Sequence, residues 1–220
     1  MRFDEVVARL ASAKGEQLPG PEAQARMAPR PRRFWVPGVV PDDARAAAAL
    51  VLIYPKHDRA TLLLTVRNHH VATHRGQIAL PGGGVDPGED VETAALREAE
   101  EEVGLARNLA TTRLSLTPLH IPVSGYVLHP VVATAAEAPG VRPSEREVER
   151  ILEVAIPDLA SGAWLRIERR ERDGAAIEIP YFALGPEDRL WGATAMVVAE
   201  LLAVLGVDVD PWGERGQRRP

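Results

Sequence analysis

The segment Val91–Val103 is predicted to be a helix that carries three glutamates on one face. Glu98, Glu101 and Glu102 occupy positions i, i+3 and i+4, so their side chains project in the same direction. Like charges at this spacing repel one another, and no lysine stands among them to compensate. A bound cation would relieve the repulsion, and three carboxylates form a suitable partial ligand set for Mg²⁺. The chain must therefore present this face to a ligand and pack the opposite, alanine-rich face on a sheet.

Glycines occupy positions 82–84, shortly before this helix. Consecutive glycines adopt backbone conformations closed to other residues and let the chain approach a ligand or metal closely. Within the helix, Glu100 lies about 200° around the axis from Glu98, so we expect it to face solvent. The glutamates alone would fit an ordinary acidic surface helix. The spacing of the whole segment is what favours a metal site.

That spacing resembles the Nudix box at every fixed position. The motif is a glycine, Glu after five residues, Arg-Glu after seven more, an apolar residue, any residue, Glu-Glu, any residue, Gly and an apolar residue. The matching residues are Gly83, Glu89, Arg97, Glu98, Ala99, Glu101, Glu102, Gly104 and Leu105. By this resemblance the chain is identified as a member of the Nudix hydrolases.

The resemblance implies a metal-dependent enzyme that hydrolyses a diphosphate linkage in a nucleotide-like molecule. It assigns Mg²⁺ or Mn²⁺ to Glu98, Glu101 and Glu102, with the Gly83 carbonyl as a further ligand. It also implies that Arg97 orients the glutamates by salt bridges. In such a site the cation polarises the phosphoryl oxygens and lowers the pKa of the attacking water. The sequence contains no cysteine, so any metal must use oxygen or histidine ligands, which favours hard cations.

The general base has two candidate locations, because the family places it variably. We favour a box glutamate, Glu101 or Glu102, and keep Glu147 or Glu149 as the alternative. Glu89 matches the first glutamate of the box. Two roles remain open for it, a structural role and the binding of an additional metal ion.

The residues upstream of the box resemble the coenzyme A pyrophosphatase branch of the family. Thr65, Arg67, Gly76 and Pro81 followed by two glycines match its pattern, and similar blocks continue downstream to about residue 205. This resemblance implies that coenzyme A or an acyl-coenzyme A is split into adenosine 3′,5′-bisphosphate and (acyl-)4′-phosphopantetheine. It places substrate contacts on Arg67, His74 and Gln77.

Two departures from that pattern, Asn68 and Ala72, keep other substrates open. The alternative enzyme is a pyrophosphatase that acts on ADP-ribose or a dinucleotide. The alternative of another class is a non-catalytic Nudix-fold ligand sensor, for which the intact box gives no support.

The order of elements predicts an α/β fold, and the resemblance specifies a Nudix-type α/β/α sandwich with a mixed β-sheet over residues 46–205. Residues 1–45 are expected to form a short N-terminal helix, Phe3–Ser12, and an irregular arm, and residues 206–220 a flexible tail. We expect Val91–Val103 and the apolar helix Thr194–Leu205 to cover opposite faces of the sheet. Strands are predicted at Ala46–Tyr54, Thr61–Arg67, Gly125–Thr134, Trp164–Arg170 and Ala176–Leu184, the last two as a hairpin around Asp173–Gly174.

The composition of the chain limits the classes of partner that it can bind. The net charge of −5, from 26 basic and 31 acidic residues, argues against nucleic-acid binding. No apolar run approaches the roughly 20 residues needed to cross a bilayer, and the N-terminus does not resemble a secretory signal. We therefore expect a cytoplasmic enzyme that acts on a small diphosphate substrate and has no membrane partner. A homodimer is compatible with the sequence.

Overall fold

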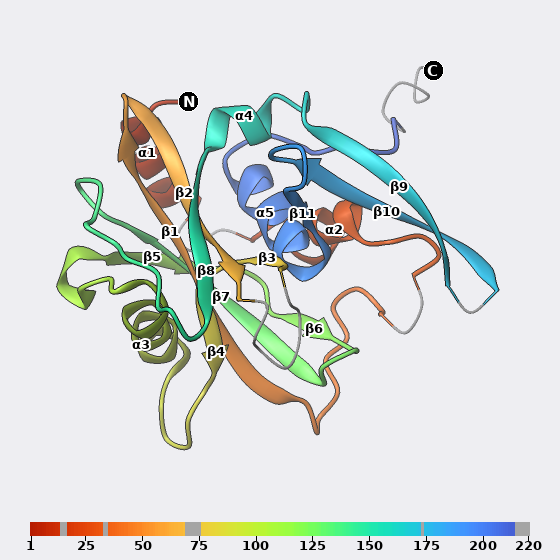
Figure 1. Ribbon diagram of the computed structural model, residues 1–220, viewed down its shortest axis with the longest axis horizontal. Coiled ribbons are helices and arrows are strands. Elements are labelled where there is room, and N and C mark those ends of the chain that lie inside the picture. The colour runs from red at the N-terminus through yellow and green to blue at the C-terminus, as the bar shows by residue number, and fades with distance from the viewer. Residues whose placement is uncertain (14–16, 33–34, 69–75, 173, 214–220) are drawn as a thin grey trace.

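The computed structural model describes residues 1–13, 17–32, 35–68, 76–172 and 174–213. Within this part of the chain, eight strands form one mixed β-sheet and three form a smaller antiparallel sheet (Figure 1). The strands of the large sheet are β1 (Arg45–Lys56), β2 (Arg59–Arg67), β3 (Ile78–Ala79), β4 (Gly82–Gly84), β5 (Thr111–Ser115), β6 (Leu119–Ile121), β7 (Tyr126–Thr134) and β8 (Val148–Ala155). The small sheet contains β9 (Leu165–Arg172), β10 (Ala175–Ala183) and β11 (Arg189–Trp191).

The helices are distributed between the two ends of the chain and the connections of the sheet. The α-helices are α1 (Phe3–Ala13), α2 (Gly20–Gln24), α3 (Val91–Val103), α4 (Ile156–Ala160) and α5 (Gly192–Val204). Two short 3₁₀ helices are η1 (Ala25–Met27) and η2 (Arg107–Leu109). Among the described residues, none of the helices has both the length and the apolar character required to span a bilayer.

Strand β1 is the centre of the large sheet. It pairs in parallel with β7, from Arg45 opposite Tyr126 to Ile53 opposite Thr134. Its other edge pairs antiparallel with β4 at one end and with β2 at the other. Where β1 and β2 diverge, the segment 78–84 enters: β3 pairs with β2, and β4 pairs with β1. This insertion places the glycine segment directly against β1.

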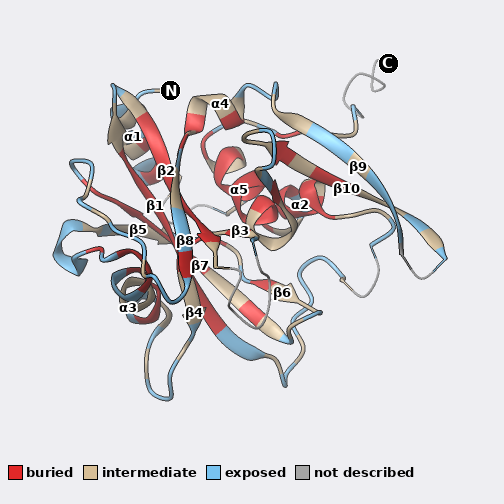
Figure 2. Cartoon of the chain, in the orientation of Figure 1, coloured by how far each residue is buried: buried red, intermediate tan, exposed pale blue. Residues whose placement is uncertain are grey.

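The two long helices cover opposite faces of the sheet, as the sequence predicts (Figure 1). Alternate side chains of β1 point into two separate cores. Leu50 and Leu52 pack with the buried alanines of α3, whereas Val51 and Ile53 belong to the core that contains α5. Figure 2 shows the resulting burial along the central strands and α5. The α/β/α sandwich with a mixed sheet is therefore confirmed.

Helix α3 has the predicted bounds because both of its ends are capped. The Asp90 carboxylate accepts hydrogen bonds from the backbone N–H groups of Glu92 and Thr93, at 3.0 and 2.9 Å. At the other end, Gly104 has a φ of 65°, and its N–H donates to the Glu100 carbonyl. The helix is thus fixed at the two points that bracket its glutamates.

The N-terminal arm differs from the sequence-based expectation of an irregular segment. It contains α2 and η1, and Met27 is completely buried in the core beside α5. The Gln24 amide donates to the buried Glu200 carboxylate of α5 at 2.8 Å. The arm packs because its few apolar and amide side chains fill one face of α5.

The first part of the predicted flexible tail also packs onto the protein. Val209 is buried, and the Trp212 indole N–H donates to the Arg26 carbonyl at 3.0 Å. These contacts join the arm to the segment that follows α5. Residues 214–220 lie outside the described part of the chain.

Candidate active site

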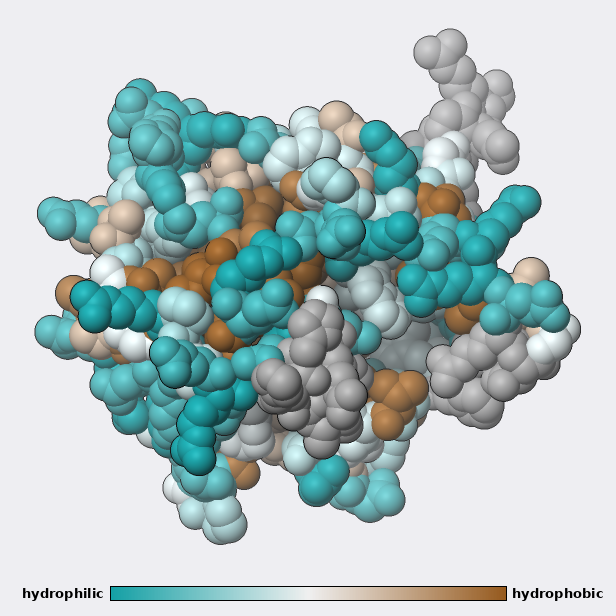
Figure 3. Space-filling view, in the orientation of Figure 1, coloured by the Kyte–Doolittle hydropathy of each residue, from teal (hydrophilic) through white to brown (hydrophobic). Residues whose placement is uncertain are grey.

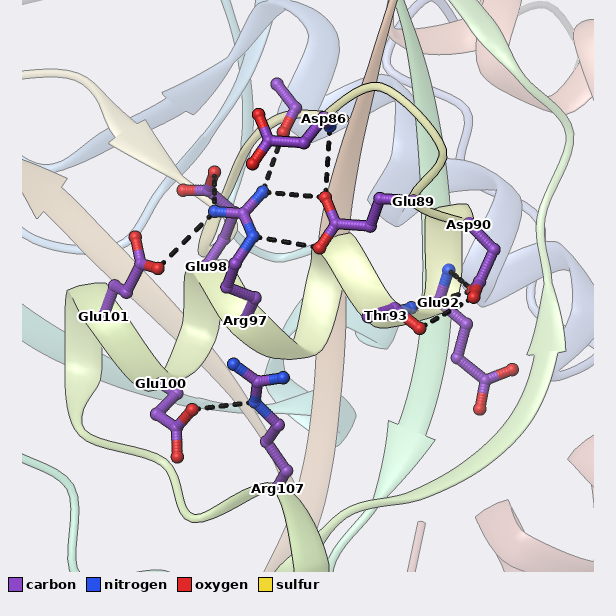
Figure 4. A network of polar contacts seen from close by, with 11 residues as sticks. Asp86, Glu89, Asp90, Glu92, Thr93, Arg97, Glu98, Glu100, Glu101 and Arg107 are labelled. Atoms are coloured by element: carbon purple, nitrogen blue, oxygen red, sulfur yellow. Dashed lines mark hydrogen bonds and ion pairs between the residues drawn. The ribbon is translucent and has the colours of Figure 1, made fainter.

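Arg97 is the centre of a network of charges along α3 (Figure 4). Its Nε and Nη2 atoms donate to the two carboxylate oxygens of Glu89, at 2.9 and 3.0 Å. Its Nη1 donates to Glu98 at 2.8 Å and lies 3.6 Å from Glu101. The guanidinium therefore joins the loop before α3 to two glutamates of the helix, and planar bidentate pairing of this kind fixes orientation.

Glu98 is held against the glycine segment. A Cβ atom added at Gly83 would lie 2.5 Å from the Glu98 carboxyl carbon, closer than real Cβ atoms come to other atoms. A Cβ at the neighbouring Gly82 would overlap the Ala48 carbonyl oxygen of β1. The two glycines are thus required for close approach, Gly82 to the central strand and Gly83 to the carboxylate.

Glu102 is an acidic side chain that is only 3% exposed. Its Oε2 accepts a hydrogen bond from the Gly82 N–H at 3.2 Å, and its Oε1 lies 3.7 Å from Nη1 of Arg67. Burial raises the pKa of Glu102 to about 7, against the lowering effects of Arg67 and the Gly82 N–H. Burial, only partly offset by Arg97, also raises the pKa of Glu98.

Glu147 lies near both of these carboxylates. Its charge adds to the rise in the pKa of Glu98 and of Glu102. The loop that carries it lies beside α3, because the Ser144 N–H donates to the Glu102 carbonyl at 2.8 Å. Among the base candidates, Glu101 is 61% exposed beside Arg97, and Glu149 is an exposed residue of β8. The structure therefore brings Glu147 to the box glutamates from a different part of the chain.

The acidic groups suit a hard divalent cation in their chemistry. Glu98 and Glu102 contact the glycine segment. Burial is the main cause of their raised pKa values, and the charges of Glu101 and Glu147 for Glu98, and of Glu98 and Glu147 for Glu102, add to the rise. In their present rotamers, no three His, Asp or Glu side chains of the described residues converge closely enough to hold a metal ion. Arg97 and Gly82 engage Glu98 and Glu102 instead. Binding a cation would require these flexible side chains to turn from those partners.

Glu100 lies apart from this cluster, as the sequence predicts. Its carboxylate accepts a hydrogen bond from Arg107 at 2.7 Å, and its side chain is 48% exposed. Figure 4 shows the pair on the side of α3 away from Glu98.

A cavity of about 280 Å³ adjoins the box. Arg67 and Gln77, two of the predicted substrate contacts, line it together with Gly82 and Gly83. Nε of Arg67 is buried without a hydrogen-bond partner among the described residues. His74, the third predicted contact, lies outside the described residues.

The cavity is also lined by residues that the sequence analysis did not assign to the site. They are Ile121, Val123, Ser124 and Leu128 of the β6–β7 hairpin and Trp191, Gly192, Ala193 and Thr194 at the start of α5. The block beginning at Trp191 stood out in the sequence as similar to the coenzyme A branch, but only the fold brings it to the box. Val123 and Ser124 belong to another block of that resemblance, Pro122–Tyr126. Ile121 and Leu128 carry no comparable signal, because apolar strand residues are common in any core.

Comparison of the sequence with known proteins identifies one family. The family model of the NUDIX domain matches residues 44–169. The chain is 32% identical over 182 residues to the uncharacterized Nudix hydrolase NudL of Photorhabdus laumondii, covering 81% of this chain and 91% of the relative. It is 34% identical over 170 residues to the uncharacterized Nudix hydrolase NudL of Shigella flexneri, covering 76% and 86%. A solved Nudix hydrolase of M. smegmatis, RenU, is 30% identical over 54% of this chain and 74% of that chain, with a TM-score of 0.46.

The protein belongs to the Nudix family. It is a pyrophosphohydrolase, an enzyme class that generally uses divalent metal ions on nucleotide-like diphosphates.

Proposed function

We propose that this enzyme hydrolyses the diphosphate of coenzyme A or an acyl-coenzyme A. The products are adenosine 3′,5′-bisphosphate and (acyl-)4′-phosphopantetheine. The observation that carries the proposal is the position of Arg67, a residue of the coenzyme A branch signature, which lines the cavity beside the buried box residue Glu102. A diphosphate placed between Arg67 and the box glutamates would meet a guanidinium that is partly exposed, 26% for the whole side chain.

Mg²⁺ or Mn²⁺ is the cofactor that the acidic cluster favours. Glu98, Glu101 and Glu102 would hold it, with the Gly83 carbonyl at the edge of the same site. When bound, the ion supplies charge neutralisation at the phosphoryl oxygens and a more acidic attacking water.

The remaining roles fall to protein groups. Arg97 positions Glu98 and Glu101 while Glu89 holds Arg97 from the other side. Arg67 binds and orients the diphosphate. For the proton of the attacking water, the carboxylate of Glu102 or Glu101 is the proposed acceptor. Glu147 is the alternative, because it approaches the same carboxylates from the loop before β8.

A second candidate substrate class is ADP-ribose or a dinucleotide, which shares the diphosphate. Asn68 supports this second class, because it departs from the branch pattern and its side chain contacts the loop that carries Glu147. Its side-chain amide donates to the Glu145 carbonyl, two residues before Glu147, at 2.9 Å. The alternative of a silent sensor is not favoured, since the contacts of Arg97 with the box are all present.

A substrate panel tests the proposal. Coenzyme A, octanoyl-coenzyme A, ADP-ribose and a diadenosine polyphosphate are compared by kcat/KM with Mg²⁺ and with Mn²⁺, and products are identified by mass. Reaction in ¹⁸O-water shows which phosphorus is attacked. We expect coenzyme A compounds to exceed ADP-ribose by about tenfold or more. If ADP-ribose or the dinucleotide is preferred, the substrate assignment is overturned.

Arg67 provides a separate check on the same proposal. Arg67→Met should weaken substrate use by about 10²-fold, because a desolvated charge-assisted contact to phosphate is lost. The control is Arg113→Met, since Arg113 donates to Thr134 on β7 and lies outside the described lining of this cavity. Equal effects of the two substitutions would refute the role of Arg67.

A further inference from the structure

A second and larger cavity, of about 760 Å³, opens beside the first. The two cavities share Ile121, Val123, Trp191, Gly192 and Ala193 in their linings, so they adjoin each other. A ligand whose diphosphate lies at the box can therefore extend past β6 and the start of α5 into the larger cavity. Volumes of this size accommodate a drug-sized molecule.

The N-terminal arm forms one wall of this larger cavity. The backbone of Arg30 pairs with that of Glu178 in β10 through two hydrogen bonds of 2.8 Å. The Arg30 guanidinium also lies 4.0 Å from the centre of the Trp212 ring. Figure 3 shows the surface hollowed between the β6–β7 turn and the β9–β10 hairpin. The wall is thus built by specific contacts between the arm, the small sheet and the segment after α5.

The floor of the larger cavity is apolar. Its buried lining residues are Ala28, Leu119, Ile179 and Met196. Charged lining side chains such as Arg32 and Arg170 are exposed and therefore lie toward solvent. A nucleobase placed on these four residues would lose hydration of its polar edge without gaining a side-chain hydrogen bond, because the polar lining residues, such as the half-buried His120, lie outside this floor. A chain of methylene groups would lose nothing of this kind and would gain burial.

We propose that the larger cavity binds the acyl chain of an acyl-coenzyme A and so makes the enzyme selective for acylated substrates. The inference rests on the proposed coenzyme A function. The diphosphate lies between Arg67 and the box, the pantetheine arm passes Trp191 and Ala193, and the acyl end reaches Ile179 and Met196.

Chain-length dependence is the primary test. We measure kcat/KM for coenzyme A and for its acetyl, butyryl, hexanoyl and octanoyl thioesters, with ADP-ribose as a substrate that has a diphosphate and no chain. Beyond acetyl, kcat/KM should rise by about threefold per added methylene until the cavity is filled. Equal kcat/KM values along the series would overturn the inference while leaving the coenzyme A assignment intact. A preference for ADP-ribose would instead overturn the proposed function.

A filled cavity provides a second test. Ile177 of β10 is half-buried and lines the cavity, so Ile177→Trp should lower kcat/KM for octanoyl-coenzyme A by about tenfold and leave ADP-ribose within about twofold. The matched control is Ile167→Trp, because Ile167 lies on the partner strand β9, is 38% exposed and is outside the described lining. The inference fails if both substitutions, or neither, lower kcat/KM for octanoyl-coenzyme A relative to ADP-ribose.

Binding without turnover supplies a readout that needs no substitution. Trp35 and Trp191 both line the larger cavity. An acyl-coenzyme A brominated at the end of its chain should quench the indole fluorescence of the metal-free protein, whereas the unbrominated compound should not. Absence of selective quenching at saturating ligand would contradict placement of the chain in this cavity.

Discussion

Gly83 and Glu98 lie so close that a single added carbon at Gly83 would stand 2.5 Å from the Glu98 carboxyl carbon. The contact joins β4 to α3 at the centre of the acidic cluster. Because β4 is itself paired with β1, the central strand of the sheet sets the position of a carboxylate of the candidate site.

Substitution of Gly83 should therefore damage catalysis more than folding. Gly83→Ala forces the Glu98 side chain to turn away, and a displaced ligand should lower kcat by about 10²-fold. Gly84→Ala is the matched control, because a Cβ there meets nothing within 4 Å and the backbone carbonyl that contacts Arg97 is retained. The prediction would be refuted by equal losses in the two variants at similar thermal stability.

Arg97 should be replaceable by lysine only at a cost in rate. Lysine keeps the charge but cannot donate in parallel to Glu89 while also reaching Glu98. We expect Arg97→Lys to lower kcat by about 10- to 100-fold with a smaller change in KM. Arg107→Lys, which alters an exposed pair with Glu100, serves as the control and should leave both constants near wild type. A change confined to KM would assign Arg97 to substrate binding instead.

The buried carboxyl of Glu102 predicts a pH-dependent stability in the metal-free protein. Its pKa rises from the ordinary 4.5 to about 7 on folding, so the folded protein binds this proton more tightly than the unfolded chain does, and protonation of Glu102 stabilises the fold. This contribution is fully present below the unfolded pKa and is lost as the pH rises through 7. Glu102→Gln remains neutral, so its stability relative to wild type should increase by about 1–3 kcal/mol between pH 4 and pH 8.

Urea denaturation in the presence of a chelator measures that difference. Glu100→Gln is the control and should show no comparable pH dependence, since its carboxylate is half-exposed and paired with Arg107. A constant difference between Glu102→Gln and wild type across this pH range would show that Glu102 titrates normally.

Local signals account for the parts of the fold that the sequence predicted. The Asp90 cap and Gly104 define both ends of α3, and β1 appears as a continuous apolar run because both faces of the strand are covered. The short strands β3, β4 and β6 were not predicted, because three residues or fewer show no periodicity and their pairing depends on the strands they meet. Likewise, nothing near Arg30 in the sequence indicates its pairing with Glu178.

The candidate site likewise has a part that the sequence predicts and a part that only the fold reveals. Spacing along one helix was enough to separate Glu98 and Glu102 from Glu100. Glu147 was only one of several candidates for the general base. Its approach to these carboxylates could not be predicted, because it depends on how the loop before β8 packs on α3. The wall made by the arm could not be foreseen, since it requires contacts between both ends of the chain.

The central claim is that Glu98, Glu101 and Glu102 act together as a metal-binding unit. Titration of Mn²⁺ followed by electron paramagnetic resonance tests it most directly, with wild type, Glu98→Gln, Glu102→Gln and Glu100→Gln compared at pH 8. We predict that the first two substitutions weaken Mn²⁺ binding by about tenfold or more and that Glu100→Gln stays within about twofold. Unchanged Mn²⁺ affinity in Glu98→Gln and Glu102→Gln, or equal weakening in Glu100→Gln, would contradict the account.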